Sequence, residues 1–209
     1  MEPSSWVFAG LGNPGARYAG TRHDLGFALV ERLAHAWGLT WSTTDPVLSL
    51  AGPHRVSRSG AEGESGEELA WLAKPLAYMN RSGPPLQALL EERELSTSRL
   101  IVACDDLNIP LGTLRLRSGG SSGGHNGLRS VEAALATQDY GRLRLGVGPL
   151  PVDVDQADWV LAPFEPEERI GSDDMLQRAM GLLHEVLTRG CLQPTTSKPE
   201  PPAEDSDDD

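Results

Sequence analysis

The sequence alternates short apolar runs of strand length with longer stretches whose hydrophobic residues recur at helical spacing. The apolar runs lie at residues 6–11, 100–103, 114–117 and 143–147, and residues 48–74 read as two strands around a polar tip at 59–66. The helical patterns lie at residues 25–37, 84–93, 126–136 and 165–188. Such alternation favours an α/β fold, because each helix can pack its apolar side on a sheet. We therefore expect a twisted, mixed and mostly parallel sheet with helices on both faces.

The length and composition indicate one domain followed by a tail. The 209 residues suffice for one domain with a proper core, and 39% hydrophobic with 23% charged residues is an ordinary globular balance. From about residue 194 the chain turns to Pro, Ser, Thr, Glu and Asp, which cannot bury a core. We predict a single catalytic domain over residues 1–193 and a disordered acidic tail over residues 194–209.

The net charge of −12 would by itself argue against a nucleic-acid partner. The charge is unevenly placed, however, since residues 198–209 carry −5 of it. Five arginines fall within a 30-residue stretch of the body, namely Arg115, Arg117, Arg129, Arg142 and Arg144. This cluster is either a solvated face or a surface that binds RNA, and the sequence leaves both interpretations open.

Several classes of protein are disfavoured. No stretch approaches the roughly 20 apolar residues of a membrane span, and residues 1–8 contain no basic side chain and no long apolar run. Cys104 and Cys191 lie far apart in no spacing typical of a metal site or a disulfide framework. We expect a cytoplasmic protein that contacts no membrane and carries no metal.

Gly10–Gly15 matches the G-x-G-x-x-G pattern of dinucleotide-binding loops and follows an apolar run. That motif requires a helix to open at the loop, whereas Pro14, Gly15 and Gly20 keep the chain irregular up to about Asp24. We interpret the segment instead as a tight loop that holds Asn13 at the rim of the sheet. Ligands of α/β proteins bind beyond the carboxyl ends of the strands, where Asp105 and the glycine-rich segment 118–127 are also expected.

His23 and Asp105 form the most economical catalytic pair. His23 ends a loop rich in glycine, which is a costly arrangement unless the loop has a function. Asp105 follows a buried strand and could bind a metal, cap a turn or orient a histidine, but few further metal ligands lie nearby. Paired with His23, the carboxylate would fix the tautomer of the imidazole. Because no Gly-x-Ser-x-Gly elbow exists, we predict a histidine-activated water and no covalent intermediate.

The segment Gly119–Gly127 reads either as a flexible linker or as a loop that lets a substrate approach the backbone. His125 and Asn126 follow its glycines directly and precede a helical pattern, which favours the second interpretation. Asn80, Asn126 and Asn13 each offer a donor and an acceptor together. Three amides suit a peptide-like ligand, or an oxyanion that needs a neutral donor.

Together these segments resemble the bacterial-type peptidyl-tRNA hydrolase family. The residues that carry the resemblance are Gly10-Leu11-Gly12-Asn13-Pro14-Gly15, Tyr18, Thr21-Arg22-His23, Lys74-Pro75, Met79-Asn80, Asp105, Gly123-Gly124-His125-Asn126-Gly127 and Arg142-Leu143-Arg144. They spread in order over residues 6–188. The resemblance implies hydrolysis of the ester between a peptide and the terminal ribose of tRNA, which recycles tRNA from aborted translation.

The resemblance also implies a role for each matching residue. His23 would activate the water with Asp105 beside it, and the substrate would be held by Asn13, Tyr18, Met79, Asn80, Gly124, His125 and Asn126. Arg117 and Arg144 would grip tRNA phosphates, since a guanidinium binds phosphate through two parallel donors. The partner would be the acceptor arm of peptidyl-tRNA with the C-terminal end of its peptide. The family implies a monomer without cofactor or metal.

The chain departs from the family pattern at several positions. Asp24, which we also expect to cap the following helix, stands where Asn is usual, and Cys104 and Asp106 stand where His and Glu usually flank Asp105. Ser121-Ser122 replaces a segment where His is common. Two alternatives stay open: a catalytically silent RNA-binding protein on this fold, similar to plant chloroplast splicing factors, and an unrelated nucleotide-binding enzyme that uses the glycine-rich loop.

Overall fold

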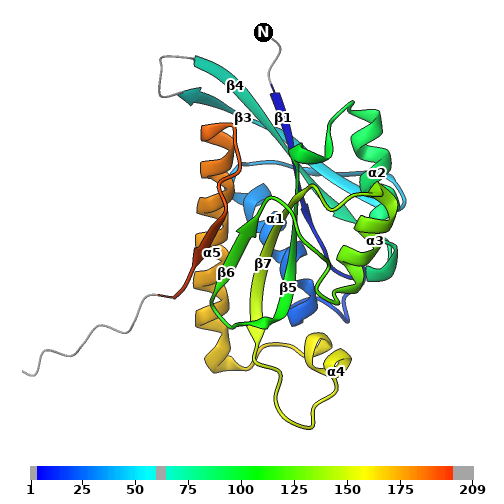
Figure 1. Cartoon of the computed structure of the whole chain (residues 1–209), viewed down its shortest axis with the longest axis vertical. Helices are drawn as coiled ribbons and strands as arrows, with labels where there is room; N and C mark the ends of the chain where they lie inside the picture. Colours follow the sequence, from blue (N-terminus) through cyan, green and yellow to red (C-terminus); the bar gives the residue numbers. More distant parts are fainter. Residues whose placement is uncertain (1–3, 60–64, 200–209) are drawn as a thin grey trace, which may run out of the picture.

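The computed structural model describes residues 4–59 and 65–199 and shows one eight-stranded sheet in the order β2-β3-β4-β1-β5-β7-β6-β8 (Figure 1). The strands are β1 (Ser4–Gly10), β2 (Trp41–Asp45), β3 (Leu48–Ser59), β4 (Ser65–Pro75), β5 (Leu100–Pro110), β6 (Leu114–Arg117), β7 (Gly141–Gly148) and β8 (Thr195–Ser197). The helices are α1 (Leu25–Ala36), α2 (Gly83–Glu92), α3 (Asn126–Leu135), α4 (Gln156–Leu161) and α5 (Pro166–Arg189). The expected single-domain α/β class is confirmed.

The sheet is mixed, but the expectation that it is mostly parallel was wrong. Only the central neighbours β4–β1, β1–β5 and β5–β7 run parallel. The outer pairings, β2–β3, β3–β4, β7–β6 and β6–β8, are antiparallel. A short turn suffices to join antiparallel neighbours, as it does between β2 and β3, whereas a parallel neighbour needs a long crossover. The strands with parallel neighbours form the centre of the sheet.

Both faces of the sheet are buried, because alternate residues of a strand point to opposite sides. In β1, Trp6 and Phe8 belong to the core that α1 and α5 complete, and Val7 and Ala9 belong to the core under α2 and α3. Figure 1 shows the two helix pairs on either side of the strands. The near-continuous apolar run at residues 6–11 is explained by this burial on both faces.

The C-terminal end differs from the sequence-based expectation. Residues 195–197 form strand β8 on the outer edge of β6, although we expected disorder from residue 194 onward. Arg178 of α5 helps to hold this strand, since its guanidinium donates to Ser197 Oγ at 2.8 Å. Composition could not reveal a strand of three residues that is stabilised by such distant contacts. Residues 200–209 of the expected tail, and 60–64 of the expected polar tip, lie outside the described residues.

Other elements differ in extent or detail. Strand β2 and helix α4 were not expected from the sequence, and β5 is longer than the expected run at residues 100–103. Asp24 occupies the N-cap position of α1, but its side chain makes no capping hydrogen bond. In the part of the chain that the structure describes, no helix combines the length and apolar character needed to cross a membrane.

A close contact between β1 and α1 positions the candidate site. A Cβ added to Gly10 would lie 2.0 Å from the carbonyl oxygen of Gly26, so that any side chain there would clash with backbone. The two glycines thus let the first turn of α1 pack directly on the loop after β1. As a consequence, His23, which precedes α1, and Asn13, which follows β1, lie at the same rim of the sheet.

Candidate active site

A cavity of about 590 Å³ opens at this rim. Its lining includes ten of the eleven side chains or glycines singled out from the sequence: Asn13, Tyr18, His23, Met79, Asn80, Asp105, Gly124, His125, Asn126 and Arg144. Arg117 lies elsewhere, on β6. The cavity thus brings together residues from the loop after β1, the turn just before α1, strands β5 and β7, and the start of α3.

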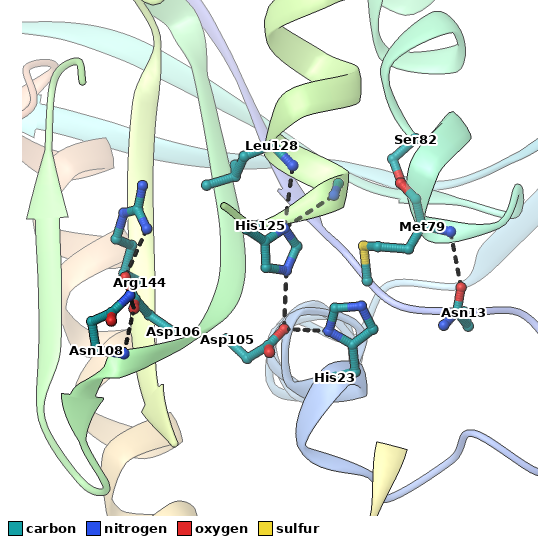
Figure 2. A network of polar contacts seen from close by, with 11 residues as sticks. Asn13, His23, Met79, Ser82, Asp105, Asp106, Asn108, His125, Leu128 and Arg144 are labelled. Atoms are coloured by element: carbon teal, nitrogen blue, oxygen red, sulfur yellow. Dashed lines mark hydrogen bonds and ion pairs between the residues drawn. The ribbon is translucent and has the colours of Figure 1, made fainter. Parts of the chain in front are cut away.

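Two histidines share one oxygen of Asp105 at the base of this cavity (Figure 2). Nδ1 of His23 lies 2.8 Å from Oδ1 of Asp105, and Nε2 of His125 lies 3.1 Å from the same atom. The two imidazole rings are 5.1 Å apart between centroids. All three side chains are largely buried, with exposed fractions of 13% for His23, 4% for Asp105 and 8% for His125.

The tautomer of His125 follows from its position at the start of α3. Its Nδ1 accepts from the backbone N–H groups of Gly127 at 3.1 Å and Leu128 at 3.2 Å, so His125 caps the helix with its ring. An atom that accepts two hydrogen bonds carries no proton, and Nε2 is therefore the protonated nitrogen of a neutral ring. His125 consequently donates to Asp105.

Asp105 is an ionised acceptor despite its burial. Burial raises the pKa of the carboxyl, but its interactions with His125, and then with His23, outweigh burial and hold the pKa well below its usual range. A carboxylate accepts hydrogen bonds and donates none, so His23 must present Nδ1–H to it. In the neutral ring, the remaining nitrogen of His23, Nε2, then carries no proton and can serve as a base.

The same three residues have donor atoms within 4.8 Å of one another, which invites comparison with a metal site. The hydrogen bonds argue against that use, because a metal ligand needs an unprotonated nitrogen. For His125 to offer Nε2, the proton would have to move to Nδ1 and would leave the N–H groups of Gly127 and Leu128 without their acceptor. The donor set fits a hydrogen-bonded catalytic group better than it fits a metal.

The amide of Asn13 is oriented by the backbone. Its Oδ1 accepts from the N–H of Met79 at 2.9 Å, so the NH₂ group is the part left for the cavity (Figure 2). Asn80 and Asn126 also line the cavity, and both are exposed. The hydrogen bond from Met79 to Asn13 connects the loop after β1 to the short 3-10 helix η2 (Met79–Arg81), which carries Asn80.

Arg144 and Arg117, both singled out as phosphate ligands, already have protein partners. The guanidinium of Arg144 donates to Asp106 Oδ2 at 2.7 Å and to the carbonyl oxygen of Ser121 at 2.6 Å, beneath the glycine-rich loop. Figure 2 shows this ion pair on the side of Asp105 away from His23. Arg117 donates to Thr195 O and to Thr196 Oγ1, each at 3.0 Å, and is thus held by β8.

One wall of the cavity escaped the sequence reading. It is formed by α4 and the residue before it, through Asp155, Gln156, Ala157, Val160 and Leu161. An aspartate before a helix is a sequence signal for its start, and Asp155 does cap α4. Its side chain accepts from the N–H groups of Ala157 and Asp158 at 2.8 and 3.3 Å. A helix of six residues is too short for its periodicity to be recognised. Tyr78 and Asp106 also line the cavity and were not singled out.

Comparison with known proteins connects this geometry to a named family. The family model described as peptidyl-tRNA hydrolase matches residues 7–205. A protein of that name from Chloroflexus aurantiacus is 41% identical over 88% of this chain and 94% of its own, and one from Frankia casuarinae is 41% identical over 92% of each. The crystal structure of peptidyl-tRNA hydrolase from Acinetobacter baumannii superposes with a TM-score of 0.73 at 31% identity, covering 91% of this chain and 92% of that one.

Proposed function

The chain belongs to the peptidyl-tRNA hydrolase family and hydrolyses the ester of peptidyl-tRNA, and from this premise we propose that His23 carries the reaction as general base. The observation that carries the proposal is the hydrogen bond between His23 Nδ1 and Asp105 Oδ1 at 2.8 Å. It holds the ring in the tautomer whose Nε2 can accept a proton, and it stabilises the imidazolium that forms.

The composition of the cavity supports water as the nucleophile. The described residues that line it include no Ser, Thr, Cys or Lys. Cys104, the residue before Asp105, is fully buried in the core, and burial raises the pKa of its thiol far above the usual range. Because the cavity offers none of the Ser, Thr, Cys or Lys side chains that commonly form an acyl-enzyme, a water that gives its proton to His23 is the most economical nucleophile.

Two proton transfers through His23 complete the proposed hydrolysis. Water oxygen bonds to the ester carbonyl carbon while His23 Nε2 takes one water proton, which gives a tetrahedral oxyanion and an imidazolium paired with Asp105. The bond from that carbon to the ribose oxygen then breaks, and His23 returns the proton to the leaving oxygen. Peptide and free tRNA are the products. The NH₂ group of Asn13 is a neutral donor for the oxyanion.

We assign the rest of the cavity to the substrate. Asn80 and Asn126 would hold peptide groups, and Tyr18, Met79, Gly124 and His125 would shape the site around the reacting carbonyl. Arg117 and Arg144 would bind phosphates of the acceptor arm once their present partners yield. Since the substrate arises in translation, we place this activity in the cytoplasm, and we expect a monomer, as the resemblance to the family implies.

The test is hydrolysis of an N-acetylated aminoacyl-tRNA by wild type and by His23→Ala. His184→Ala, which alters an exposed histidine on α5, is the matched control, and free aminoacyl-tRNA is the control substrate. We expect kcat to fall by about 10²-fold or more in His23→Ala and to stay unchanged in His184→Ala. Full activity in His23→Ala would refute the assignment of the base. Tight tRNA binding without turnover by wild type would favour the silent RNA-binding alternative.

A further inference from the structure

Arg22 directly precedes His23, the proposed base, but its side chain points into the protein interior and not into the cavity. It is only 1% exposed and ranks among the largest fully buried side chains. Its guanidinium donates to the carbonyl oxygens of Pro163 at 2.8 Å and Ala162 at 3.3 Å, and it forms an ion pair with Glu168. All of these partners belong to the segment between α4 and the first turn of α5.

Aromatic rings and backbone complete the contact. The guanidinium carbon lies 3.8 Å from the centroid of Trp159 and 5.1 Å from that of Phe164, within the range of a cation–π interaction. Trp159 is itself held, since its Nε1 donates to Val147 O at 3.0 Å. The backbone N–H of Arg22 donates to Ala162 O at 3.2 Å, and Thr21 forms an isolated bridge with Pro163.

These contacts join two parts of the active site. On one side is the turn η1 (Arg22–Asp24), which carries His23, and on the other is α4, which forms a wall of the cavity. We infer that Arg22 is a positioning residue that fixes the position of His23 relative to the α4 wall. A substrate bound against α4 then meets the base at reacting distance. The inference rests on the proposed role of His23.

The choice of arginine follows from the geometry. Its two terminal nitrogens reach two carbonyls and one carboxylate while the flat face of the guanidinium stacks on Trp159. Lysine would keep the charge beside Glu168, but its single nitrogen cannot span acceptors that two separate nitrogens reach, and it has no flat face to stack on the ring. A displacement of a catalytic group by about 1 Å can lower a rate by about 10²-fold, so a shift of His23 relative to α4 would lower kcat measurably.

The chain contains a matched control in Arg142. It is also 1% exposed, donates to two carbonyl oxygens, those of Gln138 and Tyr140, and pairs with Glu132. Its guanidinium lies 3.8 Å from the centroid of Tyr140, the same distance as in the Arg22–Trp159 contact. None of the hydrogen bonds, ion pairs or ring contacts that Arg142 makes with the described residues involves His23 or α4. Replacement of either arginine by lysine therefore removes an equivalent set of buried contacts, and only one set touches the active site.

The experiment compares Arg22→Lys with Arg142→Lys. Both variants should lose similar thermal stability, and kcat and KM are then measured at a temperature where both are fully folded by circular dichroism. We expect kcat to fall at least about tenfold in Arg22→Lys and to stay within about twofold of wild type in Arg142→Lys. Equal kcat values in the two folded variants would show that Arg22 has a structural role alone.

A second variant guards against failure of Arg22→Lys to fold. Trp159→Leu removes the ring on which Arg22 stacks, and Trp159 does not line the cavity. It should lower kcat in the same direction, and neither substitution should lower the residual rate of His23→Ala any further, because both act through that base. An unchanged kcat in folded Trp159→Leu, or additive losses with His23→Ala, would overturn the inference. If His23→Ala itself kept full activity, the proposed base would fail instead.

Discussion

His125 lies with its Nε2 atom 3.1 Å from Oδ1 of Asp105, and the helix behind the ring sets the direction of this hydrogen bond. Because the opposite nitrogen, Nδ1, receives two backbone N–H groups of α3, the proton must sit on Nε2. One imidazole thus caps a helix and supplies a donor to the carboxylate that orients His23. The two roles can be separated by substitution.

His125→Asn should retain the cap and lose the donor to Asp105. Asparagine is among the best N-cap residues, but its side chain is too short to replace the far nitrogen of the ring. We expect near-native stability with kcat lowered about tenfold or more, because Asp105 loses one of its two donors. His125→Ala should lose about 1 kcal/mol of stability in addition. Chemical denaturation and the acetylated substrate assay provide the two measurements, and wild-type kcat in His125→Asn would contradict the donor role.

Asp24→Asn should make the protein more stable at neutral and higher pH. Burial, and then the nearby Glu31 carboxylate, raise the pKa of Asp24 from 3.8 to about 7 in the folded state, and its Oδ1 is buried without a hydrogen-bond partner in the described structure. The folded protein therefore holds this proton more tightly than the unfolded chain, and stability is lost as the pH rises from about 4 through 7.

The amide removes this loss, and for a half-buried group we expect a gain of about 1–2 kcal/mol above pH 7 that vanishes near pH 4. Urea unfolding of wild type and variant at a series of pH values measures it. Asp139→Asn, at an exposed position, is the control and should show no such pH-dependent difference. A stability difference between Asp24→Asn and wild type that is constant from pH 4 to 8 would exclude the buried carboxyl as its source.

A thiol reagent should label one of the two cysteines in the folded protein. Cys191 is exposed, whereas Cys104 lies fully buried in the central strand β5, where burial and then the adjacent Asp105 charge raise the pKa of its thiol. Because the thiolate is the reactive form, Cys104 should react only after unfolding. Quantitation with Ellman's reagent should give one equivalent under native conditions and two in denaturant. Rapid labelling of Cys191→Ser would contradict the buried position of Cys104.

Removal of residues 194–209 should strengthen the contribution of Arg117 to tRNA binding. Strand β8 occupies its guanidinium through Thr195 and Thr196, and its release would free the group for a phosphate. The slope of log binding constant against log salt concentration should then steepen by the amount expected for about one further phosphate contact. Deletion of residues 200–209 alone removes six acidic side chains but leaves β8 in place.

Arg117→Gln provides the discriminating comparison for these deletions. It should weaken binding more in the chain that ends at residue 193 than in the chain that ends at residue 199. Equal effects in both would show that β8 does not restrain Arg117.

Most residues of the candidate site could be predicted from the sequence, because they follow local signals. Asn13 lies in a glycine loop after an apolar run, His23 directly precedes a helical pattern, and Asp105 follows the buried run at residues 100–103. The α4 wall could not be identified in this way, since six residues give too little periodicity. Strand β8 was missed because its stability comes from the edge of β6, and its own composition indicates disorder.

The sequence by itself determined the α/β class, the family and the motif residues that meet at the cavity, because these depend on hydrophobic periodicity and on short motifs. Only the tertiary structure decided which nitrogen of His125 carries the proton, which partners occupy Arg117, and that Arg22 is buried beneath the α4 segment. These properties depend on hydrogen bonds between distant groups, such as His23 with Asp105, 82 positions apart, and Arg22 with Glu168, 146 positions apart. The burial and protonation of a side chain are set by the residues that surround it in space, and these are brought together only by folding.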